Sequence, residues 1–88
     1  MSQIRIRLFG AFRKFVPSGR LELYVKEGLT AKQLKAEIQS ALESQTSEYL
    51  GSTLVFESAL ATESEVLSED CLIDEKMELA LLPPVCGG

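Results

Sequence analysis

The chain has 88 residues, of which 45% are hydrophobic and 25% are charged, and its net charge is −4. A chain of this length forms one domain, and no stretch approaches the ~20 apolar residues of a membrane-spanning helix. The negative charge argues against nucleic acid as a partner. Histidine is absent, so no Ser-His pair, Cys-His pair or His-based metal site can form. We therefore predict a substrate or a subunit, without a metal site, rather than a self-sufficient enzyme.

The charges are unevenly distributed along the chain. Residues 1–26 contain six Lys or Arg and one Glu, whereas residues 27–88 contain three Lys and twelve Asp or Glu. Cys71 and Cys86 have neither metal-ligand nor redox spacing, and we expect no disulfide between them. Residues 1–9 alternate arginine with apolar residues and lack the apolar run and cleavage site of a signal peptide. We expect a cytoplasmic protein that does not associate with a membrane.

The first quarter of the chain has the alternating pattern of two half-buried strands. Residues 3–9 place Ile4, Ile6 and Leu8 on one face, and Gly10 ends the run. A loop that contains Phe12, Arg13, Lys14 and Phe15 leads into the turn-prone residues 17–19. The next run points Leu21, Leu23 and Val25 inward, so the two strands are predicted to pair as a hairpin.

The strongest local signal is the start of a helix. Gly28 breaks the second strand, and Thr30 with Gln33 three residues later matches a capping box. Leu29 and Leu34 have the spacing of a hydrophobic staple. The pattern predicts a helix from about residue 31 to about residue 44, whose buried face consists of Leu34, Ile38, Ala41 and Leu42.

The second half of the chain has weaker patterns. Residues 49–51 are predicted to form a turn that buries the side chains of Tyr49 and Leu50, residues 53–56 a short strand, and residues 59–74 irregular structure. The spacing of the carboxylates here lacks the alternating ligands and central glycine of a calcium loop, so we expect a solvated acidic surface, part of which can meet a basic partner. The residues concerned are Glu63, Glu65, Glu69, Asp70, Asp74 and Glu75.

Residues 77–82 are predicted to form the last strand. Met77, Leu79 and Leu81 share one face, while the opposite face changes from Glu78 to Ala80 and Leu82. An apolar surface at the end of a strand suggests docking to a partner. Packing of Leu82 on a neighbouring loop is an equally good interpretation.

Residues 83–88 have the composition of an extended arm. Pro83 and Pro84 lack the N–H group that a sheet ladder requires, so the strand must end at Leu82. Six extended residues span roughly 20 Å, enough to enter the active site of another protein. Gly87 and Gly88 fit a narrow channel and present an unhindered terminal carboxylate. ATP-dependent adenylation would make this carboxylate an electrophile for sulfur, although an inert, frayed tail is the alternative.

The ending Leu81-Leu82-Pro83-Pro84-Val85-Cys86-Gly87-Gly88 resembles that of the MoaD/ThiS ubiquitin-like sulfur carriers, most closely the Pro-Pro-Val/Ile-x-Gly-Gly ending of the small subunit of molybdopterin synthase. Residues 8–15 also resemble the first strand and loop of that family, with Arg13 at a position where arginine is common. The chain departs from the family pattern at two places. Residues 74–78 lack the usual turn glycine, and Cys86 stands where Ser or Ala is typical.

The resemblance implies an α+β, ubiquitin-like β-grasp fold, with a mixed sheet on one main helix. Residues 1–82 would form the domain and residues 83–88 the flexible tail. An adenylating enzyme would activate Gly88 with ATP, a sulfur donor would convert it to a thiocarboxylate, and the large subunit of molybdopterin synthase would use that sulfur to convert cyclic pyranopterin monophosphate into molybdopterin. The chain itself would bind no cofactor. Gly87 would assist Gly88, and the partner-binding residues would be Arg13, Ala80, Leu82, Pro83, Pro84, Val85 and Cys86.

Three other functions stay open at this point. One is sulfur transfer for another pathway, such as thiamine thiazole synthesis or tRNA thiolation, and another is protein modification by conjugation to lysine. Both functions also require Gly88 at the terminus. The third is a plain interaction domain with an inert tail, which does not.

Overall fold

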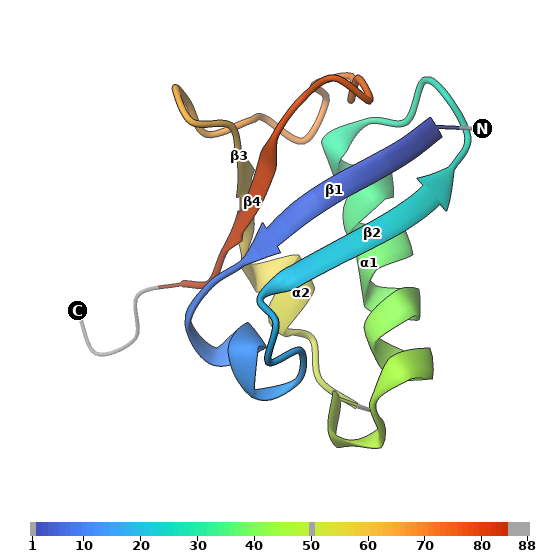
Figure 1. Ribbon diagram of the computed structural model, residues 1–88. Helices are drawn as coiled ribbons and strands as arrows, with labels where there is room; N and C mark the ends of the chain where they lie inside the picture. Colours follow the sequence, from blue (N-terminus) through green and yellow to red (C-terminus); the bar gives the residue numbers. More distant parts are fainter. Residues whose placement is uncertain (1, 50, 85–88) are drawn as a thin grey trace.

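The computed structural model describes residues 2–49 and 51–84. Four strands, two short 3₁₀ helices and two α-helices follow one another along these residues (Figure 1). Their bounds are β1 Ser2–Leu8, η1 Gly10–Lys14, β2 Arg20–Val25, α1 Ala31–Gln45, η2 Ser47–Tyr49, α2 Leu54–Glu57, β3 Ala59–Ala61 and β4 Leu79–Leu82.

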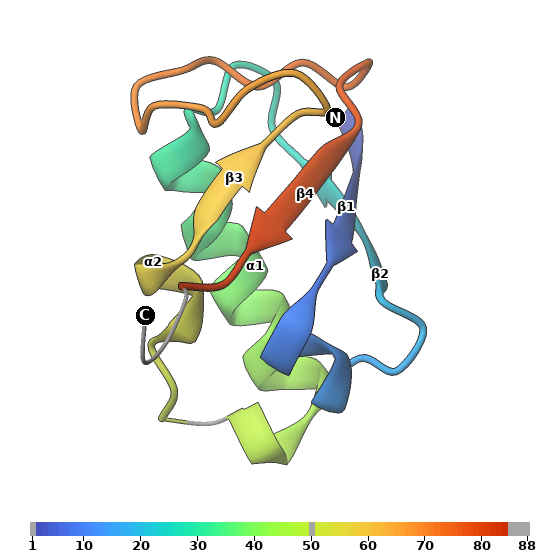
Figure 2. The same cartoon turned by 90° about the vertical axis from the view of Figure 1, so that its left-hand side faces the viewer.

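The strands form one mixed sheet in the order β2-β1-β4-β3 (Figure 2). The predicted hairpin of β1 and β2 is confirmed, with Ile4 opposite Leu23 and Arg7 opposite Arg20. β4 pairs in parallel with β1, so that Leu8 lies opposite Leu81, and pairs antiparallel with β3. The first and last strands of the chain therefore lie side by side in the centre of the sheet. This mixed sheet, packed on one main helix, is the ubiquitin-like β-grasp fold that the sequence predicted.

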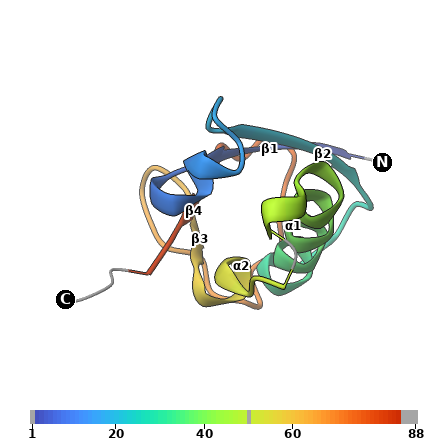
Figure 3. The same cartoon turned by 90° about the horizontal axis from the view of Figure 1, so that it is seen from below.

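The hydrophobic core lies between the sheet and α1, around which the sheet curves (Figure 3). The alternating strands point their apolar side chains toward the helix because successive strand residues face opposite sides. Leu23 and Ala41, which were expected to be buried, are only half-buried, whereas Ala31 and Lys35 join the buried face of α1. The large apolar side chains of the sheet and helix that are fully buried are Ile4, Ile6, Leu8, Leu34, Ile38, Leu42, Leu60, Leu79 and Leu81.

The start of α1 has the predicted capping box. The N–H of Gln33 donates to Oγ1 of Thr30 at 3.2 Å, and the N–H of Thr30 donates to Oε1 of Gln33 at 2.9 Å. Two of the N–H groups that a helix start leaves unpaired are thereby satisfied. Of the expected staple, Leu34 is buried in the core, and Leu29 is partly buried and packs against the core. No helix in the described part of the chain is long and apolar enough to cross a membrane.

The predicted strand over residues 53–56 is wrong, because these residues form the single turn of α2. Polar groups from outside the segment stabilise the turn. Oγ of Ser52 accepts from the N–H of Leu54 at 3.2 Å, and Oγ of Ser58 donates to the carbonyl of Leu54 at 2.6 Å. The N–H of Val55 donates to the hydroxyl of Tyr49 at 2.9 Å. An apolar run as short as residues 54–56 is equally compatible with helix and strand, so these contacts decide the conformation.

Residues 59–74, predicted to be irregular, include the short strand β3, which the sequence analysis missed. β4 begins at Leu79, two residues later than predicted, because a turn occupies the preceding residues. In that turn the N–H of Met77 donates to the carbonyl of Asp74 at 3.0 Å, and the N–H of Lys76 donates to its Oδ1 at 2.9 Å. The carboxylate of Asp74 thus makes an Asx turn without a turn glycine in residues 74–78.

Candidate functional site: the root of the C-terminal tail

The candidate site is the point where the chain leaves the sheet after β4. The strand ends at Leu82, as predicted, and Pro83 and Pro84 follow outside the ladder. Since β1 and β4 run parallel, the residues that follow β1 emerge at the same end of the sheet (Figure 1). The tail root therefore lies beside the turn from β1 to η1.

Gly10 and Pro83 make the closest contact between that turn and the tail. Gly10 has φ +60°, a backbone conformation that glycine adopts readily and other residues rarely do. A Cβ atom at this position would lie 2.8 Å from Cγ of Pro83, closer than two carbon atoms can pack. Pro83 is half-buried as a result of its packing here. The proline ring thus occupies the space that a side chain at position 10 would need.

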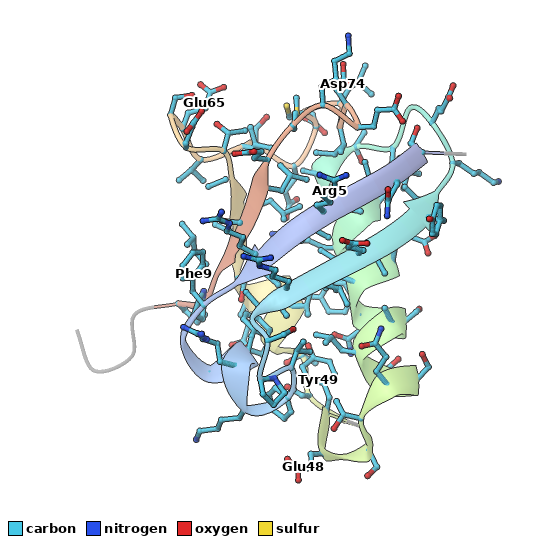
Figure 4. The ribbon with its side chains drawn as sticks, viewed as in Figure 1. Arg5, Phe9, Glu48, Tyr49, Glu65 and Asp74 are labelled. Carbon is cyan, nitrogen blue, oxygen red and sulfur yellow. The ribbon has the colours of Figure 1, made fainter. Side chains whose placement is uncertain are left out.

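Apolar side chains surround the tail root on the outer face of the sheet, which points away from α1. Leu82 is 38% exposed and Phe9 41% exposed, and Ala80 is half-buried. Phe9 follows Leu8, and Leu82 follows Leu81, the pair that ends the β1–β4 ladder. Figure 4 shows Phe9 beside the beginning of the tail. We call Phe9, Ala80 and Leu82 the apolar patch. Leu82 keeps more than a third of its surface exposed, which favours the docking interpretation over burial under a loop.

Arg13, a predicted partner-binding residue, lies in η1 near this patch. Its side chain is exposed and packs over Gly19, with Nε 3.3 Å from the position that a Cβ of Gly19 would occupy. The carbonyl of Gly19 accepts from the N–H of Leu8 at 2.8 Å, which ties this turn to the end of β1. The guanidinium group of Arg13 is thereby held next to the end of the first hairpin.

The other residues predicted for the site, Val85, Cys86, Gly87 and Gly88, lie outside the described residues. Cys71 is a free, partly buried thiol in the loop before β4. The predicted acidic surface is exposed throughout, and Glu65 and Asp74 lie at the end of the sheet opposite the tail root (Figure 4). Among residues 2–49 and 51–84, no group of His, Cys, Asp and Glu is arranged to hold a metal ion.

Tyr49, in η2 directly after α1, is fully buried at the lower end of the molecule in the view of Figure 4. Its hydroxyl donates to Oε1 of Gln39 at 2.7 Å and accepts from the N–H of Val55 at 2.9 Å. Its ring meets that of Phe15 edge to face, with centroids 5.2 Å apart. Burial raises the pKa of Tyr49 above its ordinary value of 10.0. The side chain therefore stays neutral and joins α1, α2 and the η1 region.

Two residues of this site, Phe9 and Gly10, were not predicted from the sequence. Gly10 was interpreted as the end of a strand and Phe9 as its last residue, and although both belong to residues 8–15, which carry part of the family resemblance, neither was assigned to the site. The positive φ of Gly10 and its contact with Pro83 depend on the pairing of the first and last strands, which no local pattern encodes. The one signal in the sequence was a large aromatic residue, Phe9, directly before the glycine that ends the strand, where a polar residue would be expected on an exposed surface.

The fold recurs in solved structures of a small archaeal modifier protein and of subunit 1 of molybdopterin converting factor. The small archaeal modifier protein 1 of Haloferax volcanii is 20% identical, with a TM-score of 0.73 over 97% of this chain and 100% of that one. A putative molybdopterin converting factor subunit 1 from Pyrococcus furiosus is 15% identical, with a TM-score of 0.69 over 97% and 100%. A complex of subunits 1 and 2 of molybdopterin-converting factor from Helicobacter pylori contains a chain with 23% identity and a TM-score of 0.57 over 98% and 99%.

These likenesses show the fold that the sequence resemblance implied. No protein-family model matches the chain, and no curated protein sequence does. The structural neighbours include both subunit 1 of molybdopterin converting factor and a ubiquitin-like modifier, so the fold agrees with the MoaD/ThiS-like family. What the chain does must be argued from its own tail and the surface around it.

Proposed function

We propose that the chain is a ubiquitin-like sulfur carrier and acts as the small, sulfur-donating subunit of molybdopterin synthase. The observation that carries the proposal is the placement of Pro83 and Pro84, which leave the centre of the sheet next to an exposed apolar patch. A partner that covers Phe9, Ala80 and Leu82 would receive residues 83–88 directly into its active site. The complex of subunits 1 and 2 of molybdopterin-converting factor from Helicobacter pylori supports a large subunit as that partner.

The proposed chemistry takes place at the carboxyl carbon of Gly88. An adenylating enzyme transfers AMP from ATP to the carboxylate and releases pyrophosphate. A sulfur donor then displaces AMP and leaves a thiocarboxylate. The large subunit binds cyclic pyranopterin monophosphate and supplies acid and base groups, while the thiocarboxylate donates its sulfur, and two rounds build the dithiolene. ATP is bound by the activating enzyme, so this chain needs no cofactor of its own.

Two variants test the identity of the reacting carbon. Adding one alanine after Gly88 moves the carboxylate onward and places a methyl group beside it, and deleting Gly88 shortens the tail by roughly 3.5 Å. A reacting atom misplaced by ~1 Å can lower the rate about a hundredfold, so both variants should lose sulfur transfer. The assay combines the variant with activating enzyme, ATP and sulfide, and detects by intact mass the replacement of one oxygen by sulfur. Product formation with the large subunit follows as a second readout.

Thermal unfolding provides the control, because both changes lie beyond β4 and should leave the unfolding temperature unchanged. Full sulfur transfer by the alanine-extended protein would refute the carrier function and leave an inert tail.

Protein modification is the second candidate, because the small archaeal modifier protein 1 is among the structural neighbours. A lysine amine would then displace AMP from the same acyl-adenylate and form an isopeptide bond to Gly88. The two functions differ in the product. Covalent adducts of this chain with lysine residues, without a thiocarboxylate intermediate, would favour the modifier.

A further inference from the structure

Two arginines on the outer face of the sheet lie directly opposite each other. Arg7 of β1 and Arg20 of β2 are paired in register, and both side chains are exposed. Like charges at directly opposite positions of antiparallel strands destabilise the sheet. Within the described part of the chain neither guanidinium forms a hydrogen bond or an ion pair. We call these two residues the arginine pair.

The neighbouring positions show that this pair is the least neutralised part of the face. On one side, Arg5 lies opposite Glu22 of β2. On the other side, Ile6 pairs with Leu79 of β4, so Glu78, the residue before Leu79, lies next to Arg5 in the same register. Figure 4 shows Arg5 projecting from β1 on the side away from α1. Arg7 instead lies between Arg20 and Ala80 and has no carboxylate opposite it on either side. The only acidic residue on β2, Glu22, accepts a hydrogen bond from Nε2 of Gln3 at 2.9 Å.

The arginine pair is continuous with the surface proposed to receive a partner. Arg7 pairs with Ala80, which belongs to the apolar patch. Arg20 directly follows Gly19, over which the side chain of Arg13 packs. Arg5, Arg7 and Arg20 also line a surface groove of about 670 Å³, and the carboxylates of this groove, Glu22, Glu75 and Glu78, come from β2 and from the residues before β4. The arginine pair is thus the part of this mixed-charge groove that has no carboxylate opposite it in the strand register, and it lies next to the apolar patch.

We propose that the protein partner that covers the apolar patch carries an acidic strip that faces Arg7 and Arg20. In the free chain the two guanidinium groups repel each other, and carboxylates on the surface of a bound partner would offset this repulsion. Complementary charges beside an apolar contact accelerate encounter and fix orientation. This inference rests on the proposed function and adds the chemistry of the partner surface to it.

The test uses purified adenylating enzyme and purified large subunit, with association and dissociation rates measured at several salt concentrations. Arg7→Glu and Arg20→Glu should each slow association roughly tenfold or more and flatten its salt dependence. Arg20→Lys keeps the charge and should stay close to the wild type. Lys32→Glu is the matched control: it makes the same charge change at an exposed position of α1, on the opposite face of the sheet. It should leave the rates unchanged.

A second measurement needs no partner. Arg20→Glu replaces the like-charge pair with an opposite-charge pair, so its unfolding temperature at low salt should rise above that of the wild type. Unchanged stability would show that Arg7 and Arg20 do not interact and would remove the basis of the proposal.

The binding outcomes distinguish the two proposals. If the wild type binds a partner and the glutamate variants bind as fast as Lys32→Glu, the acidic strip is refuted while the carrier function stands. If the wild type binds neither partner, both are refuted. Binding of a single-stranded RNA oligonucleotide that the glutamate variants abolish, without any effect on the protein partners, would assign the pair to nucleic acid and overturn the proposal.

Discussion

Gly10→Ala should disturb the exit of the tail more than it disturbs the domain. The substitution has two separable effects. Alanine at positive φ costs about 1–2 kcal/mol in the folded state. Its Cβ would also lie 2.8 Å from Cγ of Pro83, and overpacking of this kind typically costs about 1–3 kcal/mol unless the neighbour moves. Pro83 is followed by the tail, so the neighbour that must move is the root of the reactive arm.

Gly28→Ala is the matched control for the backbone effect. Gly28 has φ +80°, and no atom lies within 4 Å of the position that its Cβ would occupy. Alanine at positive φ destabilises both variants, but only in Gly10→Ala does the new Cβ atom collide with the proline ring. If the ring holds its place, Gly10→Ala should be less stable than Gly28→Ala by about 1–3 kcal/mol, a difference of roughly 4–8 °C per kcal/mol in a domain of this size. If the ring yields, the two stabilities should match while sulfur transfer falls only in Gly10→Ala.

Pro83→Ala identifies the contact directly. Pro83→Ala removes the Cγ atom that the new Cβ would meet. The double variant Gly10→Ala/Pro83→Ala should therefore regain the stability or the sulfur transfer that Gly10→Ala loses beyond Gly28→Ala, as measured by a double-mutant cycle of chemical unfolding and of sulfur transfer. Pro83→Ala alone supplies the fourth corner of the cycle. Equal stability and equal sulfur transfer in Gly10→Ala and Gly28→Ala would refute the argument that Gly10 directs the tail.

Three further predictions follow from single contacts. Leu82→Asp should leave the free energy of unfolding within about 1 kcal/mol, since 38% of the side chain is exposed, but weaken partner binding, as measured by calorimetry; unfolding of this variant would place Leu82 in the core. Tyr49→Phe should lose about 1–3 kcal/mol in urea titrations, because the N–H of Val55 loses its acceptor. The raised pKa of Tyr49 means that the unfolded chain releases the phenolic proton first, so wild-type stability should fall as pH rises above about 10 and the difference from Tyr49→Phe should shrink there; a constant difference would contradict this. Asp74→Ala should lower the unfolding temperature because the N–H of Lys76 loses its acceptor, whereas Asp74→Asn should retain most of the stability.

The features that sequence patterns predicted correctly are local or periodic. The capping box of α1 needs only Thr30 and Gln33, three residues apart, and the hairpin needs only two adjacent alternating runs. Such signals contain all the groups that form the contact. The end of β4 at Leu82 was equally predictable, because a proline cannot continue a ladder whatever surrounds it.

The features that were missed depend on residues distant in the sequence. α2 is a single turn whose Val55 N–H is held by the hydroxyl of Tyr49, and no periodicity over four residues reveals that contact. β3 contains two alanines, which have low strand propensity, and is a strand because it pairs with β4. In the candidate site, the sequence made exposure and burial of Leu82 equally good interpretations, and only the assembled sheet shows that its side chain is exposed. Sequence alone thus located the tail but not its surroundings.

The parallel pairing of β1 with β4 explains why the tail root has these surroundings. Two parallel neighbours leave a sheet at the same end, so the residues after Leu8 must meet the residues after Leu81. Phe9 and Gly10 therefore become neighbours of Leu82 and Pro83, although they belong to opposite ends of the chain. An antiparallel pairing would have sent the tail past the start of β1 instead. The topology of the fold itself brings a glycine, an exposed aromatic ring and the arginine pair to the point from which the proposed reactive arm departs.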